Sequence, residues 1–377
     1  MRKTQIAFNQ DGRHIRFTNF ADEESIQFET RAHSLIVDAS FEQHLFYATK
    51  SKREFYLLQI EDEKQKPLFH ACVYVARPKL LRFFGMATAP GLGRGATLNE
   101  ESLGLEILAK LMNNIPGIMT LRIQPRRFSE EGLRNFTQVA KLKNYSITSP
   151  LGATHTRFVH LAEPEETFIK SVPQKTRAKL RHPSKKDIRI FDIRDQNCLK
   201  ACERAMAASR MRSGGGKTDY AFQTAFEIAK SLPEHAKFLG LSLADSPDRL
   251  LAYGIAFRTG ERCEFSSAGG LGDPILRSIP YNYFIFWELL SWARKMGAKI
   301  VDMGGITDGG PDDPLQGISR FKRSFPGDEI EISQEVVRII RPKLFTTYST
   351  IKSLVSGLRW RNSISFTTLR QKSLGAT

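Results

Sequence analysis

Residues 262–306 read RCEFSSAGGLGDPILRSIPYNYFIFWELLSWARKMGAKIVDMGGI, and the order of elements within this stretch decides the fold. A helix is predicted over about 282–295, because apolar side chains recur there at helical spacing and Gly297 is a natural stop. The stripe consists of Ile285, Leu289, Trp292 and Met296. Strands are predicted on either side of the helix, at 262–268 and 299–303.

The same order of elements occurs earlier in the chain, at an offset of roughly 180 residues. In the second half, strands predicted at 238–243 and 250–257 precede the quoted stretch. The first half has strands predicted at 54–60, 68–76 and 80–87, a glycine-rich loop at 90–96, a helix at 99–114 and a strand at 118–123. The chain therefore has the pattern of a duplicated module.

A three-strand meander, a loop, a helix and a further strand form the core order of the GNAT acyltransferase fold, in which an acyl donor sits where two neighbouring strands splay apart. The repeat predicts an α/β protein with mixed sheets, built as tandem GNAT-like domains. We expect the first domain at 1–160 and the second at 161–334. The chain should return to the first domain from about residue 335, and 341–377 forms a basic tail.

The composition favours a folded protein with a polyanionic partner. With 377 residues, 41% hydrophobic content and 26 Phe, the chain can bury two cores, which argues against intrinsic disorder. Lys and Arg number 56 against 40 Asp and Glu, a net charge of +16. Such an excess attracts nucleic acid, nucleotide-linked substrates or an anionic membrane surface, and charge alone does not choose among them.

Cysteine and histidine patterns give no sign of a disulfide framework or a metal site. The four cysteines form no C-x-x-C pair, and the eight histidines form no H-E-x-x-H spacing. Cys198 and Cys202, four apart on a predicted helix, are most simply packing residues. No apolar run follows the basic start, and no stretch approaches the ~20 apolar residues of a transmembrane helix. We expect a cytoplasmic protein with at most peripheral contact at the inner face of the membrane.

More specific motifs surround the predicted helix of the second half. They are PY at 280–281, WELLSWA at 287–293, VDMGGI at 301–306, GI at 317–318 and FKRSF at 321–325. Upstream stand FEQ at 41–43, Lys50 and TRAKLR at 176–181. Taken together, these motifs resemble the FemABX family, aminoacyl-tRNA-dependent peptidyltransferases that add bridge amino acids to peptidoglycan precursors. The likeness covers nearly the whole chain.

The resemblance implies a catalytic role for Lys322 and substrate binding by Gly305 and Phe321. A fixed cation could stabilise the oxyanion formed when an amine attacks the aminoacyl ester. Because the ester is already activated, the reaction needs no nucleophilic residue, metal or cofactor, and aminoacyl-tRNA serves as the co-substrate. From pattern alone, Lys322 could instead be an ordinary solvent-facing lysine of an alternating strand segment.

Two further groups of cations are candidates for binding substrates. Lys50 and Arg210 could hold the diphosphate of a nucleotide-linked or lipid-linked precursor, and helix-surface charge is the alternative for both. A basic run could contact tRNA phosphates, and solvated charge is the alternative there. This run includes Arg177, Lys179 and Arg181.

Departures from the family pattern keep two other functions open. Relatives often have an acid where this chain has Gln124, so no general base is assigned, and Gly214 to Gly216 preclude a long continuous helical arm. One alternative is a coenzyme A-dependent N-acyltransferase acting on a polysaccharide or small amine. Pro90 argues against it, because it stands where such enzymes have Gln or Arg before the pyrophosphate loop. The other alternative is a non-enzymatic basic RNA-binding protein.

The tail from Arg341 onward contains basic and apolar residues and no acid. Such a basic amphipathic segment could lie on an anionic membrane, or it could fold back on the first domain. The sequence leaves both arrangements open.

Overall fold

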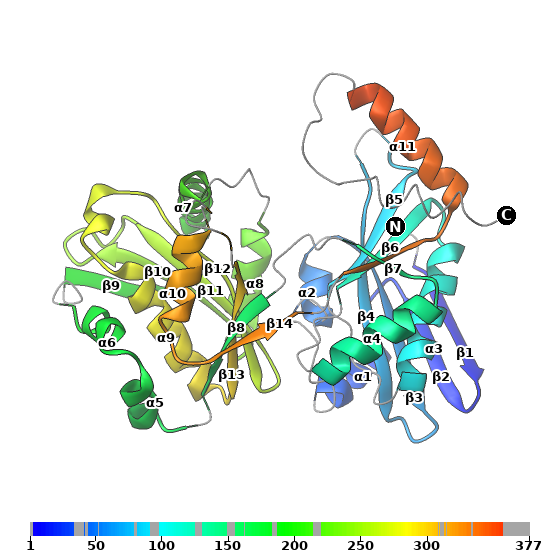
Figure 1. The fold of residues 1–377 in the computed structure, drawn as a ribbon, viewed down its shortest axis with the longest axis horizontal. Helices are drawn as coiled ribbons and strands as arrows, with labels where there is room; N and C mark the ends of the chain where they lie inside the picture. Colours follow the sequence, from blue (N-terminus) through cyan, green and yellow to red (C-terminus); the bar gives the residue numbers. More distant parts are fainter. Residues whose placement is uncertain are drawn as a thin grey trace.

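The computed structural model places two lobes side by side, each built on a mixed β-sheet (Figure 1). It describes residues 3–33, 41, 44–51, 53–78, 81–90, 98–124, 130–148, 155–161, 163–182, 187–213, 220–307, 309, 313, 315–332 and 335–356. The predicted fold class, α/β with mixed sheets, is confirmed.

The first sheet has eight strands within the described residues. In spatial order they are β1 (Gln5–Gln10), β2 (Arg13–Thr18), β3 (Glu54–Asp62), β4 (Pro67–Ala76), β5 (Gly85–Pro90), β6 (Ile118–Gln124), β15 (Val336–Ile339) and β7 (Ser146–Ile147). The helices of this lobe are α1 (Glu23–His33), α2 (Leu45–Lys50), α3 (Leu98–Asn114), α4 (Glu130–Leu142) and α11 (Pro342–Ser356). Strands β1 to β5 pair antiparallel in sequence, and β5 then pairs parallel with β6 through the crossover helix α3.

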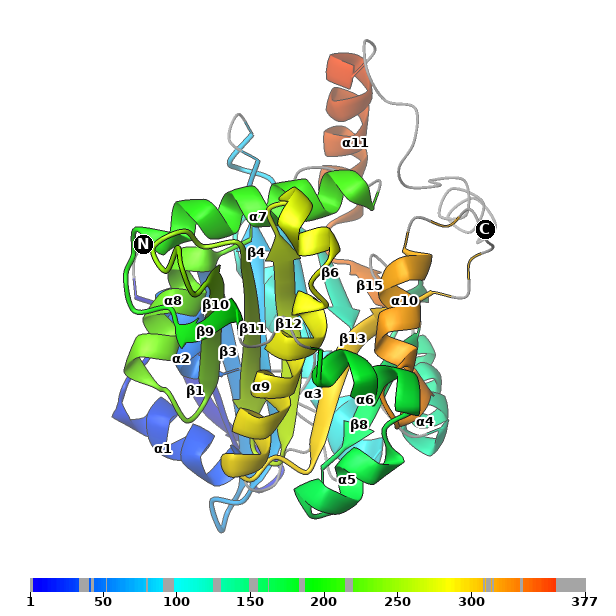
Figure 2. The same cartoon turned by 90° about the vertical axis from the view of Figure 1, so that its left-hand side faces the viewer.

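The second sheet has seven strands within the same described part of the chain. In spatial order they are β14 (Asp328–Glu331), β8 (His155–His160), β13 (Ile300–Ile306), β12 (Arg262–Gly270), β11 (Ala252–Thr259), β10 (Ala236–Leu243) and β9 (Ile188–Asp192). Its helices are α5 (Glu165–Ser171), α6 (Gln174–Leu180), α7 (Cys198–Arg212), α8 (Phe222–Ser231), α9 (Tyr281–Lys295) and α10 (Gln316–Arg323). A short 3-10 helix spans Pro274–Arg277, and α9 lies across the sheet (Figure 2).

The predicted repeat of elements is present in both sheets. The meander β3–β4–β5 and the parallel strand β6 in the first lobe match β10–β11–β12 and β13 in the second. One predicted strand is displaced, because the strand expected at 80–87 begins only at Gly85. The preceding residues form a turn in which Leu81 N donates to Pro78 O and Phe84 N donates to Leu81 O.

The two lobes exchange neighbouring segments of chain. Strand β8, which precedes residue 160, lies in the second sheet beside β13. Strand β15, which follows residue 334, lies in the first sheet beside β6. The division into domains at residue 160 stays a prediction, and sheet membership follows these pairings.

A hydrophobic cluster joins the two lobes. It includes side chains of α2 and α8, two helices that lie between the sheets in Figure 1. Phe41 from the first half stacks on Phe257 from the second, with ring centroids 4.9 Å apart and planes 5° apart. Tyr47 of α2 packs edge-on against the same Phe257 ring. Buried apolar contacts of this kind favour a fixed arrangement of the two lobes.

No helix in the described part of the chain is both long and apolar enough to span a membrane.

Candidate active site

The parallel strands β12 and β13 pair over only three residues before they part. Their partners are Arg262 with Ile300, Cys263 with Val301 and Glu264 with Asp302. Beyond this point β12 continues to Gly270 and β13 continues to Ile306 with no further pairing between them. The backbone of both strands is thus released at the middle of the second sheet.

Both strands carry a β-bulge at the point where they part. Along β12, Ile255 and Ala256 of β11 face Ser267 and Phe265, so Ser266 is an extra residue. Along β13, Asp302 and Gly305 face Phe158 and Thr156 of β8, again with one extra residue. Gly304 lies in this second bulge at a φ of 77°, a conformation that suits glycine. Bulges of this kind end strand pairing and re-aim neighbouring groups.

Lys322 reaches this point from helix α10. Its side chain is buried, with 9% of its surface exposed, and its Nζ donates a hydrogen bond of 2.6 Å to the carbonyl oxygen of Gly305. The interpretation of Lys322 as a solvent-facing strand lysine is therefore wrong, because Lys322 is buried and lies in a helix. Phe321 and Phe325 are one helical turn apart, and both pack inward against Phe286 of α9, which turns Lys322 toward β13.

Burial lowers the pKa of the Lys322 ammonium to about 8. The negative charge of Asp302 acts in the opposite direction and favours the protonated form. Lys322 is thus a buried cation that loses its proton close to physiological pH, a property shared by many catalytic lysines.

Asp302 is the centre of a buried polar network at the same place. Its carboxylate accepts hydrogen bonds from Thr156 Oγ1, from the backbone N of Gly304 at 2.8 Å, and from Arg262 Nη2 at 2.5 Å. Arg262 also lies 3.6 Å from a carboxylate oxygen of Glu264. These bonds fix the β13 bulge and hold a negative charge near Lys322. Asp302, Arg262 and Thr156 were not singled out as site residues from the sequence. The sequence does offer one signal for Asp302, which is an acidic residue in a predicted buried strand just before two consecutive glycines.

Helix α6 contributes a cation next to the aromatic cluster on α9 and α10. Lys179 Nζ donates to the hydroxyl of Tyr283 at 2.8 Å and lies 4.4 Å from the centre of its ring. The Tyr283 ring contacts Phe321 edge-on at 5.0 Å. Arg177 is partly engaged, because its Nη1 donates to the backbone oxygen of Lys170, and Arg181 is exposed at the end of α6. One of the three predicted tRNA-binding cations is thus in contact with the cluster that contains Phe321.

The two predicted precursor-binding cations lie on different lobes. Lys50 ends helix α2, and its Nζ lies 5.4 Å from the centre of the Phe46 ring. Arg210 lies on α7 near Tyr253. Burial raises the pKa of the Tyr253 phenol, and the positive charge of Arg210 acts in the opposite direction. Next to Arg210, Ser209 Oγ accepts from the backbone N of Gly270 at 3.0 Å, which ties α7 to the free end of β12. Arg212 also donates to the Gly270 oxygen, at 3.1 Å, and it was not singled out from the sequence.

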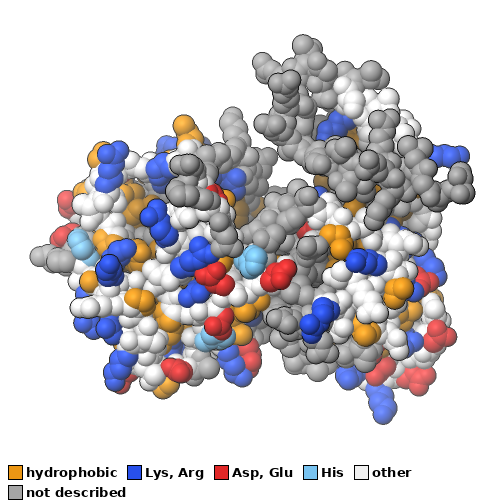
Figure 3. Space-filling view, viewed as in Figure 1, with side chains coloured by type: hydrophobic (Ala, Val, Ile, Leu, Met, Phe, Trp, Pro, Cys, Tyr) orange, Lys and Arg blue, Asp and Glu red, His pale blue; other side chains and the backbone are white. Residues whose placement is uncertain are grey.

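Cations are spread over the face of the second lobe in Figure 3, with hydrophobic and acidic side chains between them. Several motifs of the sequence analysis fall outside the described residues: Glu42, Gln43, the loop 91–96 and Gly214 to Gly216. Within the part of the chain that is described, no three His, Cys, Asp or Glu side chains gather in a way that could hold a metal ion.

The repeated meander with its parallel fourth strand, present in each lobe, defines a FemABX-like tandem GNAT fold. The crystal structure of FemX is similar, with a TM-score of 0.69 and 14% identity, over 85% of this chain and 97% of FemX. A tandem GNAT protein from the clavulanic acid biosynthesis pathway has a TM-score of 0.50 and 11% identity, over 87% of this chain and 99% of that protein.

No family model matches the sequence, and no curated protein matches it. Identities this low show a shared fold, so the activity has to be argued from the site itself.

Proposed function

We propose that this protein is an acyltransferase that moves an amino acid from aminoacyl-tRNA to an amine of a peptidoglycan precursor peptide. The observation that carries the proposal is the buried Lys322 at the point where β12 and β13 part. A buried, hydrogen-bonded cation next to unpaired backbone is suited to stabilise negative charge that develops on a substrate oxygen.

The proposed reaction needs little covalent participation by the protein. The amine nitrogen of the acceptor bonds to the carbonyl carbon of the aminoacyl ester and gives a tetrahedral intermediate with a negative oxygen. The bond from that carbon to the ribose oxygen then breaks, an amide forms, and the proton lost by the nitrogen ends on the ribose hydroxyl. Lys322 donates one ammonium hydrogen to Gly305, and no second acceptor is present among the described residues, so the other two hydrogens can serve the oxyanion.

The surroundings of Lys322 support an RNA-linked donor. Lys179 and Tyr283 present a cation and an aromatic face beside Phe321, a combination that suits phosphate and base contacts of a tRNA end. Lys50 and Arg210 remain our candidates for the diphosphate of a nucleotide-linked or lipid-linked precursor, and Gly305 and Phe321 for the acceptor side of the site.

The direct test is an incubation of the protein with tRNA charged with one radiolabelled amino acid at a time, together with a panel of precursors. Transfer of label to a precursor amine supports the proposal. Binding of tRNA with steep salt dependence and no transfer would instead indicate the non-enzymatic RNA-binding alternative.

A coenzyme A-dependent N-acyltransferase is the second candidate, and the parting of β12 and β13 favours it as well. Such enzymes place a thioester donor between splayed strands, and the tandem GNAT protein of the clavulanic acid pathway shares this overall fold. Calorimetry with coenzyme A and acetyl-coenzyme A separates the two candidates. Tight binding of either would favour the second candidate, and no binding together with transfer from tRNA would exclude it.

A further inference from the structure

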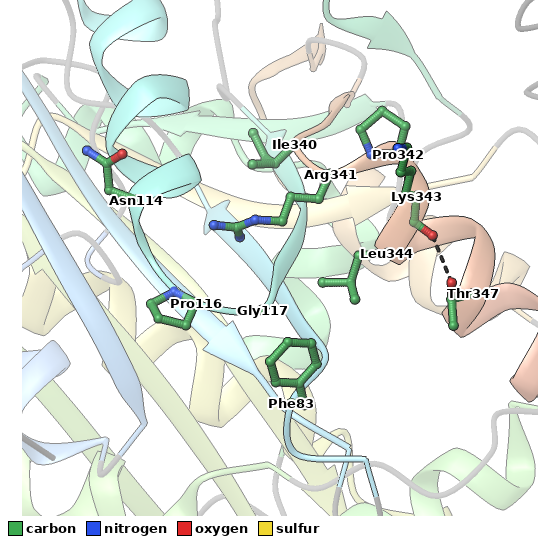
Figure 4. A pocket seen from close by; sticks show the side chains of 10 residues that line it. All are labelled: Phe83, Asn114, Pro116, Gly117, Ile340, Arg341, Pro342, Lys343, Leu344 and Thr347. Carbon is green, nitrogen blue, oxygen red and sulfur yellow. Dashed lines mark hydrogen bonds between the residues drawn. The ribbon is translucent and has the colours of Figure 1, made fainter.

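A surface at the base of helix α11 is both apolar and basic, and it lies outside the candidate active site. Helix α11 extends beyond the rest of the first lobe (Figures 1 and 2). At its start, Phe83, Pro116, Ile340, Pro342 and Leu344 line a cavity of about 920 Å³ (Figure 4). We call these residues, with Arg82 and Lys343, the α11 surface.

The apolar side chains of this surface are unusually open. Phe83 has 63% of its surface exposed, at the tip of the turn that precedes β5. None of the described side chains of α11, residues 342–353, is buried, although the helix contains Leu344, Phe345, Tyr348 and Ile351. A helix with this many apolar residues normally covers a core, so the exposure points to a partner.

The charge of the α11 surface is of one sign. Arg82 and Lys343 are exposed, and the ten residues that line the cavity include no Asp or Glu. The sequence of α11 contains no acid either. The Arg341 guanidinium makes internal hydrogen bonds, because it donates to the backbone oxygens of Ile115 and Ile118 at 2.8 and 2.9 Å. These bonds anchor the start of α11 to the turn between α3 and β6.

We propose that the α11 surface binds an anionic lipid bilayer. An exposed aromatic ring beside aliphatic side chains can enter the headgroup region, and flanking cations attract anionic lipid. Charge complementarity favours a bilayer, because the exposed cations Arg82 and Lys343 flank the apolar side chains and α11 carries no acid. The arrangement does not depend on the proposed chemistry, and binding requires neither tRNA nor precursor.

Flotation of the full-length protein with vesicles tests the proposal. Vesicles of phosphatidylcholine with 30% phosphatidylglycerol should carry the protein to the top of a density gradient, because each cation near an anionic surface raises the affinity roughly fivefold. Vesicles of pure phosphatidylcholine should not carry the protein, and high salt should release it from the anionic vesicles.

Three point variants locate the contact within the full chain. Phe83→Asp and Lys343→Glu should each weaken binding to the anionic vesicles by roughly tenfold or more. Leu142→Asp is the matched control, because Leu142 is 73% exposed, stands between Lys141 and Lys143 at the end of α4, and does not line the cavity. That control should bind as the wild type does, and thermal unfolding of each variant checks that it is folded.

Two outcomes would overturn the proposal. One is binding of Phe83→Asp and Lys343→Glu at wild-type strength. The other is loss of binding in a full-length variant with Arg370→Glu and Lys372→Glu while the α11 variants bind normally, which would assign the contact to the end of the tail. Neither outcome depends on transfer activity, so failure here and failure of the proposed function are separate results.

Discussion

The two lobes share an order of elements and differ where the parallel strands meet. In the first sheet β5 stays paired with β6 from Gly85 to Pro90, along the whole of β5, although the register shifts by one residue after Gly85. In the second sheet β12 leaves β13 after Glu264. The same topology thus produces a closed sheet in one lobe and an open one in the other.

Single residues account for much of this difference. When Ile118 at the start of β6 is aligned with Ile300 at the start of β13, Thr120 matches Asp302 and Arg122 matches Gly304. Gly304 adopts a positive φ and permits the bulge, whereas Arg122 continues the ladder and pairs with Glu335. A duplicated fold therefore need not contain a duplicated site, and we expect chemistry in the second lobe alone.

The largest effect we predict follows from that asymmetry. Lys322→Ala should lower the rate of transfer by about a hundredfold to a thousandfold, the usual cost of removing a group that stabilises an oxyanion. Arg320→Ala is the matched control, because Arg320 is an exposed cation on the same helix. Single-turnover assays with charged tRNA measure both variants. If Lys322→Ala transferred at the wild-type rate, Lys322 would not be the residue that stabilises the oxyanion, and the reaction class would remain open.

The next prediction compares matching glycines in the two lobes. Gly117 and Gly297 each end the turn between the crossover helix and the parallel strand, at φ values of 78° and 80°. A Cβ at Gly117 would lie 1.9 Å from the backbone oxygen of Phe83, whereas a Cβ at Gly297 would meet nothing within 4 Å.

Gly297→Ala should therefore reduce the free energy of unfolding by about 1 kcal/mol, from the strained φ alone. Gly117→Ala should cost roughly 3 kcal/mol, because the backbone must also move. Urea unfolding with a common m-value gives both differences. Equal losses would contradict the close packing of Phe83 against Gly117.

Local sequence patterns predicted most of the repeated helices and strands, but they did not predict where β12 and β13 part. The stripe from Ile285 to Met296 and the stop at Gly297 predicted α9, which spans Tyr281–Lys295. The register of β12 against β13 depends on residues far apart in sequence, so no local pattern reports where the pairing ends. The segment 321–325 around Lys322 is also ambiguous in sequence, because five residues fit both a strand and one turn of helix. The packing of Phe321 and Phe325 against Phe286 decides in favour of the helix.

The residues around Lys322 show the same limit. The resemblance to the FemABX family singled out Lys322 and Gly305, and the structure brings these two into contact. It did not single out Arg262 and Thr156, which reach Asp302 from 40 and 146 residues away in the chain. A buried polar network of this kind becomes visible only when the strands are placed side by side.

A smaller effect concerns the pH dependence of transfer. Because the pKa of Lys322 is lowered to about 8, its cation is lost as the pH rises through that value. If the cation stabilises the oxyanion, the rate should fall about tenfold for each unit above pH 8. Lys322→Arg should remove this fall, because guanidinium stays protonated. A rate that rises through pH 8 to a plateau would instead indicate that neutral Lys322 acts as a base.

The smallest effect we predict separates Asp302 from its counterpart in the closed sheet. The negative charge of Asp302 favours protonated Lys322, so Asp302→Asn should lower the pKa of Lys322 further and move the alkaline fall in rate to lower pH. Thr120→Ser, at the matching position of β6, should leave the pH profile where it is. The amide oxygen of Asn can still accept from Thr156 and Gly304, whereas its NH2 group cannot accept the bond from Arg262. We expect the first two bonds to keep the bulge, and near-ultraviolet circular dichroism checks this. A reduced rate with an unshifted profile would assign Asp302 a structural role only.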